Sequence, residues 1–483
     1  MTTYNLDLAQ LDALFHGEQI NASVINAINS YLIGLHDTTG TSDTKDKITE
    51  ENFSTSAAAT AQVEILTAGT TSVNTDDDPK LQLIVLDNDS SGGSASQNVT
   101  ITGHANIGVA TGDGSNTITL SDYGNDRVIT GTGSNTVTGG FGSDSLYGGG
   151  GTDSLTASSG SHSLVDAATG NNETLIGGSG EYDSVEAGTG NNNSLQAGTG
   201  SRQLLQAGNG ANATLVGGSG GDDTLTAGNG NADSLQAGSG DYQSLHAGSG
   251  VGDTLIGGAG DHDSLVVGSG AGDVLEAGSG NHQHLTAGLG AGDSLQGGEG
   301  NYQSLLAGNG AHDTLTGGGG DYQTLTAGSG ADDSLQGGTG NFQTITAGGG
   351  SNDTLTGGTG SYQTLSAGSG NDDSLSAGSG SHQKLTAGSG SHDSLSGGTG
   401  DNQTLIAGIG NHDVLTAGSG NDQSLFAGTG TGDTLTGGSG SGDTLVSTGA
   451  DAQLLTGSAA GESLHGSGAN DTFYAGGAGA AGA

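Results

Sequence analysis

A ten-residue repeat fills most of the chain and limits the folds that it can adopt. From Asn171 to Ala450 the sequence divides into 28 units with the consensus x-x-(D/Q)-(S/T)-L-x-(A/G)-G-x-G, and the fifth column is aliphatic in every unit. Apolar residues ten apart cannot form the stripe of an amphipathic helix, which needs spacings of three and four. The S/T-L-x triplet instead predicts a very short strand with its Leu inward. The glycines predict a turn in which positive φ costs little.

The third column reveals the true period of the repeat. From Gln283 to Asp433 it alternates Gln and Asp without a break, so one coil takes 20 residues and contains two strands and two turns. We therefore predict an all-β protein, a parallel β-solenoid with about 20 residues per coil. The aspartate edge carries Asp233, Asp253, Asp273, Asp293, Asp313, Asp333, Asp353, Asp373, Asp393, Asp413 and Asp433, and the glutamine edge carries Gln283, Gln303, Gln323, Gln343, Gln363, Gln383, Gln403 and Gln423.

The second column distinguishes the two edges further. Rings precede the glutamines at Tyr302, Tyr322, Phe342 and Tyr362, and imidazoles do so at His282 and His382. Residues 20 apart stack in a solenoid, so we predict a column of rings beside a ladder of Gln amides, as in stacked β structures. No ion is expected on this glutamine edge.

The charge of the chain favours cations as partners. Asp and Glu number 51 against six Lys and Arg, a net charge of −45, which argues against nucleic acid and anionic membranes as partners. Carboxylates at the strand spacing of about 4.8 Å would repel by roughly 0.9 kcal/mol per pair even in water. We predict a divalent cation between successive aspartates. Calcium, Ca2+, suits oxygen ligands that include turn carbonyls. The alternative is a solvated acidic edge.

Residues 139–156 carry a second, shorter motif. They read GGFGSDSLYGGGGTDSLT, two copies of G-G-x-G-x-D-x-U-x, and looser copies such as SDYGNDRVI precede them. This nonapeptide resembles that of the repeats-in-toxin (RTX) family. The resemblance implies a parallel β-roll that binds calcium at Asp126, Asp144 and Asp153. It also implies an extracellular or cell-surface location reached by type I secretion. The ten-residue units add one residue between glycine and acid, which would reshape the calcium turn or abolish it.

Composition and pattern also predict the domain organisation. We expect an N-terminal helical segment and linker over 1–60, a β-rich cap over 61–138, calcium-binding-type repeats over 139–450, and a C-terminal cap and Gly/Ala tail over 451–483. Apolar stripes indicate helices within 5–36. No apolar run is long enough to span a bilayer. The first residues lack the basic and apolar regions of an ordinary signal peptide.

Catalytic motifs do not emerge from the sequence, and we predict that the protein is not an enzyme. There is no H-E-x-x-H, and GGSGG at 217–221 matches G-x-S-x-G only because glycine is so frequent. Cysteine is absent, which excludes disulfides and thiolate metal sites. Zinc at His312, His392 and His412 is a possibility, and exposed turn histidines are the simpler interpretation.

These features favour a structural function. We predict a secreted, calcium-stabilised solenoid that binds copies of itself head to tail and builds an extracellular filament, matrix or surface layer. The first alternative is a calcium-dependent surface adhesin with a ligand domain within 1–130. An ice-binding protein is another, because outward pairs such as Thr314 and Thr316 recur, although Ser-Leu-Gln at 334–336 interrupts a flat Thr face. An enzyme with a repeat tail is the last.

Overall fold

The computed structural model describes residues 3–6, 46–50, 62–66, 70–77, 81–86, 96–112 and 114–474. The chain divides into two compact units, unit 1 (Met1–Gln243) and unit 2 (Ser244–Ala483). Each unit is a parallel β-solenoid in which strands of sheet A alternate along the chain with strands of sheet B. The predicted all-β solenoid with about 20 residues per coil is confirmed.

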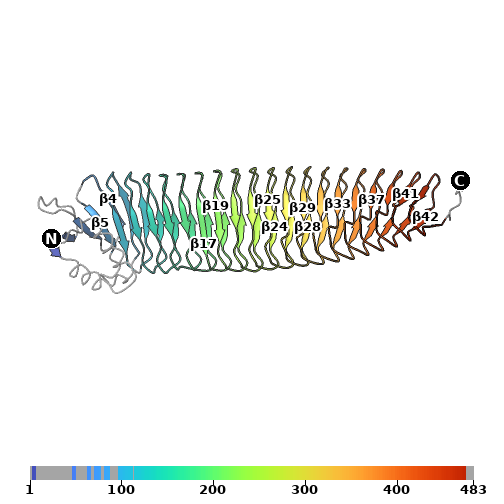
Figure 1. Cartoon of the computed structure of the whole chain (residues 1–483). Coiled ribbons are helices and arrows are strands. Elements are labelled where there is room, and N and C mark those ends of the chain that lie inside the picture. Colours follow the sequence, from blue (N-terminus) through green and yellow to red (C-terminus); the bar gives the residue numbers. More distant parts are fainter. Residues whose placement is uncertain are drawn as a thin grey trace, which may run out of the picture. The chain divides into compact units, whose positions relative to one another are not determined.

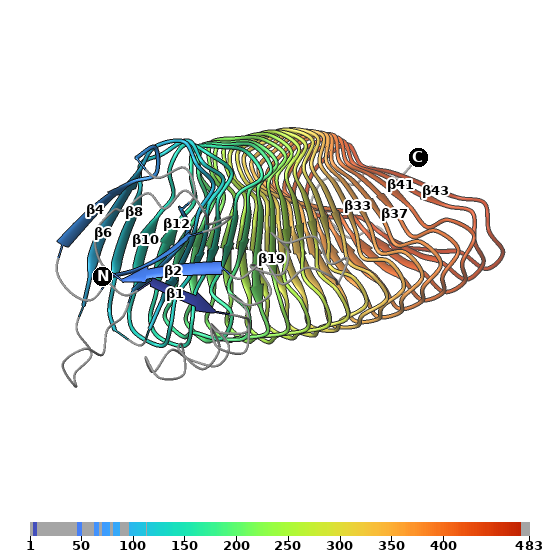
Figure 2. The same cartoon turned by 90° about the vertical axis from the view of Figure 1, so that its left-hand side faces the viewer.

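In unit 1 the strands lengthen toward the N-terminus. Sheet A contains β1 (Thr3–Leu6), β2 (Asp46–Glu50), β3 (Gln62–Leu66), β5 (Leu81–Leu86), β7 (Gly108–Thr111), β9 (Arg127–Ile129), β11 (Ser145–Tyr147), β13 (Leu164–Asp166), β15 (Ser184–Glu186), β17 (Leu204–Gly208) and β19 (Thr224–Ala227). Sheet B contains β4 (Thr70–Asn74), β6 (Asn98–Thr102), β8 (Thr117–Leu120), β10 (Thr136–Thr138), β12 (Ser154–Thr156), β14 (Thr174–Ile176), β16 (Ser194–Gln196), β18 (Thr214–Val216) and β20 (Ser234–Gln236). Figure 2 shows β4, β6, β8, β10 and β12 following one another in this sheet.

In unit 2 nearly every strand has three residues. Sheet A contains β21 (Ser244–His246), β23 (Ser264–Val266), β25 (His284–Thr286), β27 (Ser304–Leu306), β29 (Thr324–Thr326), β31 (Thr344–Thr346), β33 (Thr364–Ser366), β35 (Lys384–Thr386), β37 (Thr404–Ile406), β39 (Ser424–Phe426), β41 (Thr444–Ser447) and β43 (Ser463–Gly466). Sheet B contains β22 (Thr254–Ile256), β24 (Val274–Glu276), β26 (Ser294–Gln296), β28 (Thr314–Thr316), β30 (Ser334–Gln336), β32 (Thr354–Thr356), β34 (Ser374–Ser376), β36 (Ser394–Ser396), β38 (Val414–Thr416), β40 (Thr434–Thr436), β42 (Gln453–Leu455) and β44 (Thr472–Tyr474). Figure 1 shows β25, β29, β33 and β37 in one row, with β24 and β28 in the other.

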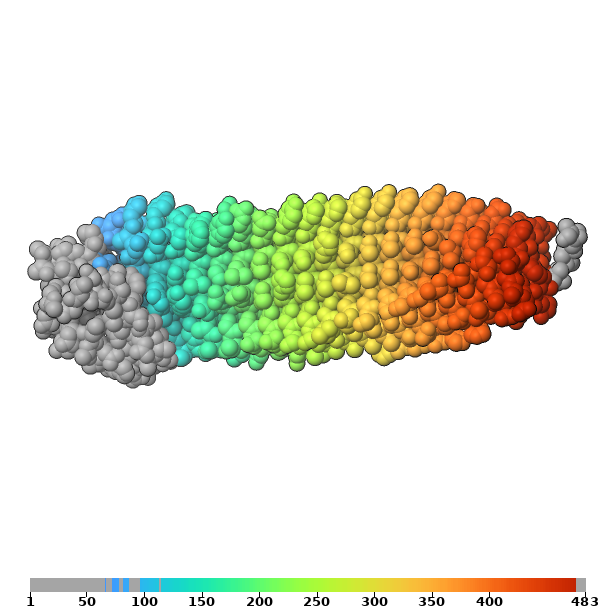
Figure 3. All heavy atoms as spheres, viewed as in Figure 1, coloured from blue at the N-terminus to red at the C-terminus, as the bar shows by residue number. Residues whose placement is uncertain are grey.

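The core is a single column of aliphatic side chains per sheet. The second residue of every strand from β10 to β42 is no more than 1% exposed, because its side chain points inward between the two sheets. The parallel register pairs Ile345 with Leu365, so identical columns stack from coil to coil. The coils of unit 2 are visible as successive layers in the space-filling view (Figure 3).

Two expectations for the N-terminal part change. β1 occupies Thr3–Leu6 and pairs antiparallel with β2, which lies in the predicted linker. Residues 5 and 6 of the segment 5–36, predicted to be helical, therefore lie in a strand, and the part of the chain that the structure describes contains no helix. Most of the segment 5–36, on which the helices were predicted, lies outside the described residues.

Positive φ lies mainly in the second column rather than at the glycines. Tyr322 has φ 60° and Phe342 has φ 57°, in the left-handed region that costs a non-glycine residue about 1–2 kcal/mol. The tenth-column glycines serve a different purpose, close approach between coils. A Cβ on Gly350 would lie 1.6 Å from the carbonyl oxygen of Gly330, so only hydrogen fits there.

Candidate cation site

The third column faces the interior of the turn. Asp353 and Asp373 are 0% and 1% exposed, and the other aspartates of the column are buried to the same degree. The alternative of a solvated acidic edge is therefore wrong. The carboxylates follow the strand alternation, two positions before the inward Leu, and so point inward with it. An unpaired buried charge is costly in free energy, so the stability of this column depends on the partners of each carboxylate oxygen.

One carboxylate oxygen of each aspartate, Oδ1, accepts a backbone hydrogen bond. The backbone N–H of Asp333 donates to Oδ1 of Asp353 at 2.9 Å, and that of Asp353 donates to Oδ1 of Asp373 at 2.9 Å. The same bond recurs along unit 2 from Asp253 to Asp433. In unit 1, Ala213 donates to Oδ1 of Asp233 at 2.8 Å. Each carboxylate thus ties two coils together.

The second oxygen is buried and accepts no hydrogen bond. This holds for Oδ2 of Asp273, Asp293, Asp313, Asp333, Asp353, Asp373, Asp393, Asp413 and Asp433. The point where a Cβ would stand on Gly350 lies 2.9 Å from Oδ2 of Asp353 and 1.6 Å from the carbonyl oxygen of Gly330. Two acceptors therefore converge with no donor between them. Such an arrangement requires a proton or a cation.

On the glutamine edge, the side-chain amide donates hydrogen bonds to the equivalent turn carbonyls. Nε2 of Gln363 donates to the carbonyls of Gly338 and Gly340 at 3.3 and 3.2 Å, and its Oε1 accepts the N–H of Gly358 at 2.7 Å. Nε2 also donates to Oε1 of Gln343 at 3.0 Å, so the predicted amide ladder is confirmed from Gln303 to Gln383. The amide hydrogens occupy the position that a cation would need.

Asparagine shows what the aspartate column itself lacks. Asn193 stands in the equivalent column of unit 1, before a strand of sheet B, and its Nδ2 donates to the carbonyl of Gly190 at 3.0 Å. Asn135 makes the same contact to Gly133 at 2.8 Å. Where the residue is Asp, the atom beside the turn glycine is an acceptor. The turn is therefore built for a positive group at that place.

Burial also changes the acidity of these groups. Burial raises the pKa of Asp373 and of Asp413 to about 7; neighbouring carboxylates raise it too, and backbone donors lower it. It raises the pKa of Asp353 to about 6 in the same way. The carboxylates are therefore less stable as free anions in the fold than in water, and they would gain from a bound cation.

The nonapeptide residues divide into two groups. Both oxygens of Asp144 accept backbone N–H groups, from Asp126 at 2.9 Å and Gly140 at 2.8 Å. Asp153 is satisfied in the same manner, with Asn135 and Gly149 as donors. Oδ2 of Asp126, in contrast, is buried and accepts no hydrogen bond. Asp126 and Asp144 precede strands of sheet A and Asp153 precedes one of sheet B, so the nonapeptide aspartates lie on both edges and the one-sided aspartate edge does not extend to them.

Asp122 is a functional candidate that the motif did not indicate. It is fully buried, and neither of its oxygens accepts a hydrogen bond. Burial first, and then the charge of Asp122, raise the pKa of Asp126 to about 9, and Asp122 also raises that of Asp144. Asp122 stands where the neighbouring copy has the second glycine of the motif, Gly140, so a consensus search passes over it.

The added residue in the ten-residue units reshapes the turn. In the nonapeptide, the N–H of Gly140 donates to the carboxylate four residues later, in Asp144. In the longer units the outcome depends on the edge. Before a sheet A strand, the N–H of Gly438 still donates to Oδ2 of Asp443, five residues later, at 3.1 Å. On the aspartate edge, the N–H of Gly268 donates instead to the carbonyl of Gly248 at 2.9 Å, and Oδ2 of Asp273 accepts no hydrogen bond. No group of three Asp, Glu or His side chains converges on a metal position among the described residues. Further ligands would therefore be backbone carbonyls.

The outer surface carries the predicted ring column. Seven rings from His262 to His382 stack at centroid distances of 4.8–5.1 Å and interplanar angles of 5–10°. The histidines suggested for zinc do not form one cluster. His392 stacks on His412, whereas Nδ1 of His312 lies 3.8 Å from Oδ2 of Asp332.

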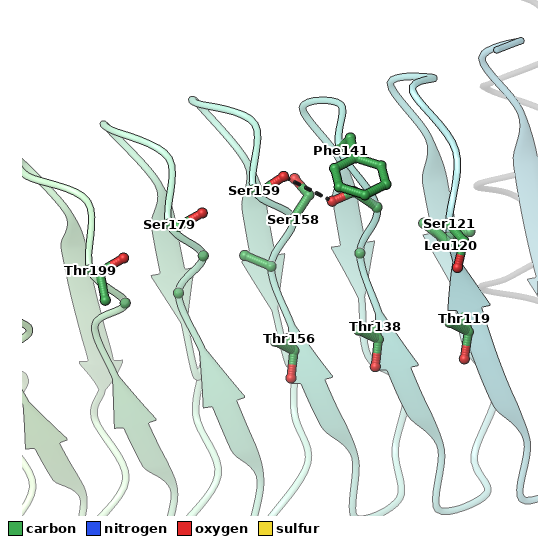
Figure 4. A pocket seen from close by; sticks show the side chains of 16 residues that line it. Thr119, Leu120, Ser121, Thr138, Phe141, Thr156, Ser158, Ser159, Ser179 and Thr199 are labelled. Atoms are coloured by element: carbon green, nitrogen blue, oxygen red, sulfur yellow. Dashed lines mark hydrogen bonds between the residues drawn. The ribbon is translucent and has the colours of Figure 1, made fainter. Parts of the chain in front are cut away.

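A groove crosses the turns after β8, β10, β12, β14 and β16 in unit 1 (Figure 4). Hydroxyls of Thr119, Thr138 and Thr156 line it in a row, with the exposed ring of Phe141 at one side. Oγ of Ser159 donates to the carbonyl of Gly140 at 3.4 Å across it. No acid, base or histidine lines the groove, so it offers no group for acid–base catalysis.

The fold defines a class, the parallel β-solenoids. The family model of the RTX calcium-binding nonapeptide repeat matches the chain in four copies, at residues 120–155 and 456–478. Together with the solenoid, these matches support an RTX β-roll family, as the motif at 139–156 implied. They also support Ca2+ as the bound ion. No curated protein and no solved structure gave a significant match.

The family matches also provide information on the C-terminal residues 451–483 and on the general function of the protein. The second match lies within 451–483, predicted as cap and tail, and β42, β43 and β44 continue the two sheets there. RTX-type solenoids suggest a secreted structural repeat protein, typically extracellular or surface-associated and typically non-enzymatic. None of the residues described here forms a helix that could cross a membrane.

Proposed function

We propose that the chain is a secreted structural protein whose aspartate edge binds calcium and whose solenoid then assembles head to tail into an extracellular filament, matrix or surface layer. The observation that carries the proposal is the column of buried Oδ2 atoms beside turn carbonyls, which lacks any donor. The predicted ligands are Asp126, Asp144, Asp153, Asp233 and the ladder from Asp253 to Asp433. Asp122 joins Asp126 and Asp144.

A bound calcium ion would supply the positive charge that the turn lacks. The aspartates would hold it through Oδ2. The carbonyls of the tenth-column glycines lie close by and would serve as neutral oxygen ligands. The chain itself supplies the scaffold. The Oδ1 bonds fix each carboxylate, and the glycines allow the coils to approach. Neutralisation would remove the repulsion along the column and stabilise the fold by mass action.

Circular dichroism in chelator and then in millimolar calcium tests the calcium part. We expect weak β signal and a low melting temperature in chelator, and a cooperative β structure with calcium. Magnesium serves as the matched control, because it is smaller and demands a stricter octahedral geometry. A spectrum and melting temperature that calcium leaves unchanged would refute calcium-stabilised folding.

A further inference from the structure

The ring column of the glutamine edge is not used by the calcium function. It comprises His262, His282, Tyr302, Tyr322, Phe342, Tyr362 and His382, stacked in register. The Tyr and Phe side chains of this column remain 44–50% exposed despite the stacking. Because the rings lie face to face, they present their edges to solvent. The neighbouring first and ninth columns hold small or acidic residues such as Asp321, Ser361 and Gly319, which leave those edges uncovered.

The backbone at these positions would favour other residues. Tyr302, Tyr322, Phe342 and Tyr362 have φ of 57–60°, a region that glycine and asparagine adopt far more readily than aromatic residues. The equivalent column on the aspartate edge is filled accordingly, with Gly252, Gly272 and Gly292, then His312, Asp332 and Asn352. On the glutamine edge itself Asn402 stands at φ 58°. The chain therefore keeps aromatic rings where its backbone disfavours them, as is common at binding sites.

Ring edges in a stack recognise a particular kind of molecule. The edge of an aromatic ring is electropositive and its face electronegative, so a flat aromatic ligand laid across the edges makes edge-to-face contacts. With rings 4.8–5.1 Å apart, a tricyclic ligand lying along the column would meet two or three rings at once. The net charge of −45, with Asp321 and Glu299 beside the column, would favour a cation over an anion.

We propose that the ring column binds elongated, planar, cationic aromatic molecules, which lie flat across the edges of successive rings. The proposal is independent of calcium, since the rings face outward and the third-column side chains face inward. Stacking between the rings themselves would stabilise the fold without any ligand, and the test separates these two roles.

Proflavine, a cationic tricycle, is the probe, and its binding is measured by fluorescence anisotropy in calcium at moderate ionic strength. We expect saturable binding, quenching of tyrosine emission, and about tenfold weaker binding for the anionic anthracene-2-sulfonate. The variant with Tyr302→Asn, Tyr322→Asn, Phe342→Asn and Tyr362→Asn should keep its β spectrum, because asparagine suits the backbone, and should lose at least about tenfold in affinity. The control variant Asp332→Asn/Asp372→Asn changes exposed charges on the other edge and should bind proflavine within about twofold of the unchanged protein.

Unchanged proflavine binding by the four-ring variant would overturn the proposal, and so would equal loss in the control, which would indicate general attraction to acids. If the four-ring variant does not fold, proflavine binding and the melting temperature are measured on the single variant Phe342→Asn, which divides the ring column into shorter runs. Weakened binding with an unchanged melting temperature supports the site. Unchanged binding with a lowered melting temperature would mean that the rings act only in folding.

Discussion

At the scale of single residues, the difference between Asp and its amide decides what a turn can hold. Gln363 and Asn193 fill their turns with amide hydrogens, whereas Asp353 brings an oxygen to the equivalent place. The alternation of Gln and Asp is therefore an alternation of turns that contain an amide donor and turns that contain an oxygen without a donor. The sequence predicted which residues alternate. It did not predict that both side chains point inward, although their place two positions before the inward Leu is a signal for that direction.

Reciprocal substitutions test this reading. The variant Asp333→Asn/Asp353→Asn/Asp373→Asn should bind fewer calcium ions, by at most one for each position changed. In chelator it should be more stable than the unchanged protein, by roughly 1–3 kcal/mol per position, because each new Nδ2 can donate to a turn carbonyl. Isothermal titration calorimetry and urea unfolding measure the two effects.

The matched variant changes the other edge. Gln323→Glu/Gln343→Glu/Gln363→Glu should leave the number of calcium ions nearly unchanged and should destabilise the solenoid, by roughly 1–3 kcal/mol per position. The reason is that Nε2 of Gln343, which donates to the carbonyl of Gly318, is replaced by an acceptor. Equal loss of calcium from both variants would show that the edges are not chemically distinct.

At the scale of elements, the turn and not the strand sets how closely coils can stack. Each three-residue strand from β20 to β42 contributes one buried aliphatic residue, while the turn glycines place the backbone of one coil against the next. The sequence predicted strand, turn and coil because Leu, Gly and the 20-residue period repeat so regularly. It attributed the glycines to positive φ, and the structure assigns that mainly to the second column. Contacts between coils have no signature in a single repeat, so that reason could not be read from the pattern.

Two adjacent glycines provide a matched pair for this claim. Gly350→Ala should destabilise unit 2 by about 1–3 kcal/mol, because its Cβ would meet the carbonyl of Gly330. Gly349→Ala should change stability by no more than about 0.5 kcal/mol, since the nearest atom to its Cβ would be Oγ of Ser369 at 3.6 Å. Thermal unfolding in calcium compares the two. Similar losses would mean that glycine acts here through chain flexibility alone.

The aspartate column as a whole should make the calcium-free protein sensitive to pH. Burial raises the folded-state pKa of Asp353 to about 6 and of Asp373 to about 7, above the ordinary aspartate pKa of 3.8. A raised pKa contributes stability that is fully present below about pH 4 and is lost as the pH rises through 6 and 7. We expect the melting temperature in chelator to fall over that interval.

Calcium should reverse this dependence at neutral pH, because it binds the deprotonated carboxylates. Melting curves at several pH values, with and without calcium, measure both effects. The triple variant Asp333→Asn/Asp353→Asn/Asp373→Asn is the control and should show a weaker pH dependence. A melting temperature in chelator that rises between pH 4 and 7 would contradict the assignment of buried, unpaired carboxylates.

At the scale of the whole molecule, the solenoid could act as a monomer or as the subunit of a polymer, and its C-terminal end favours the polymer. The second residue of β44, Phe473, is 49% exposed, whereas the second residues of the strands from β10 to β42 are at most 1% exposed. A strand whose inward residue lacks cover can accept another strand against its edge. We propose that residues 1–138 of one copy contact residues 451–483 of the next. Such a contact joins two different surfaces, so it propagates instead of closing.

Deletion of residues 1–36 should therefore yield soluble monomers that still bind calcium, while the full chain forms particles that grow with concentration. Light scattering in calcium follows the mass, and electron microscopy distinguishes filaments from amorphous aggregates.

Phe473→Ser tests the other surface and should weaken assembly without changing the calcium stoichiometry, because the buried carboxylates of unit 2 are untouched. A full-length protein that stays monomeric at high concentration in calcium would exclude the filament. The adhesin would then become the better explanation, since a monomer must act through a ligand and not through its own polymer.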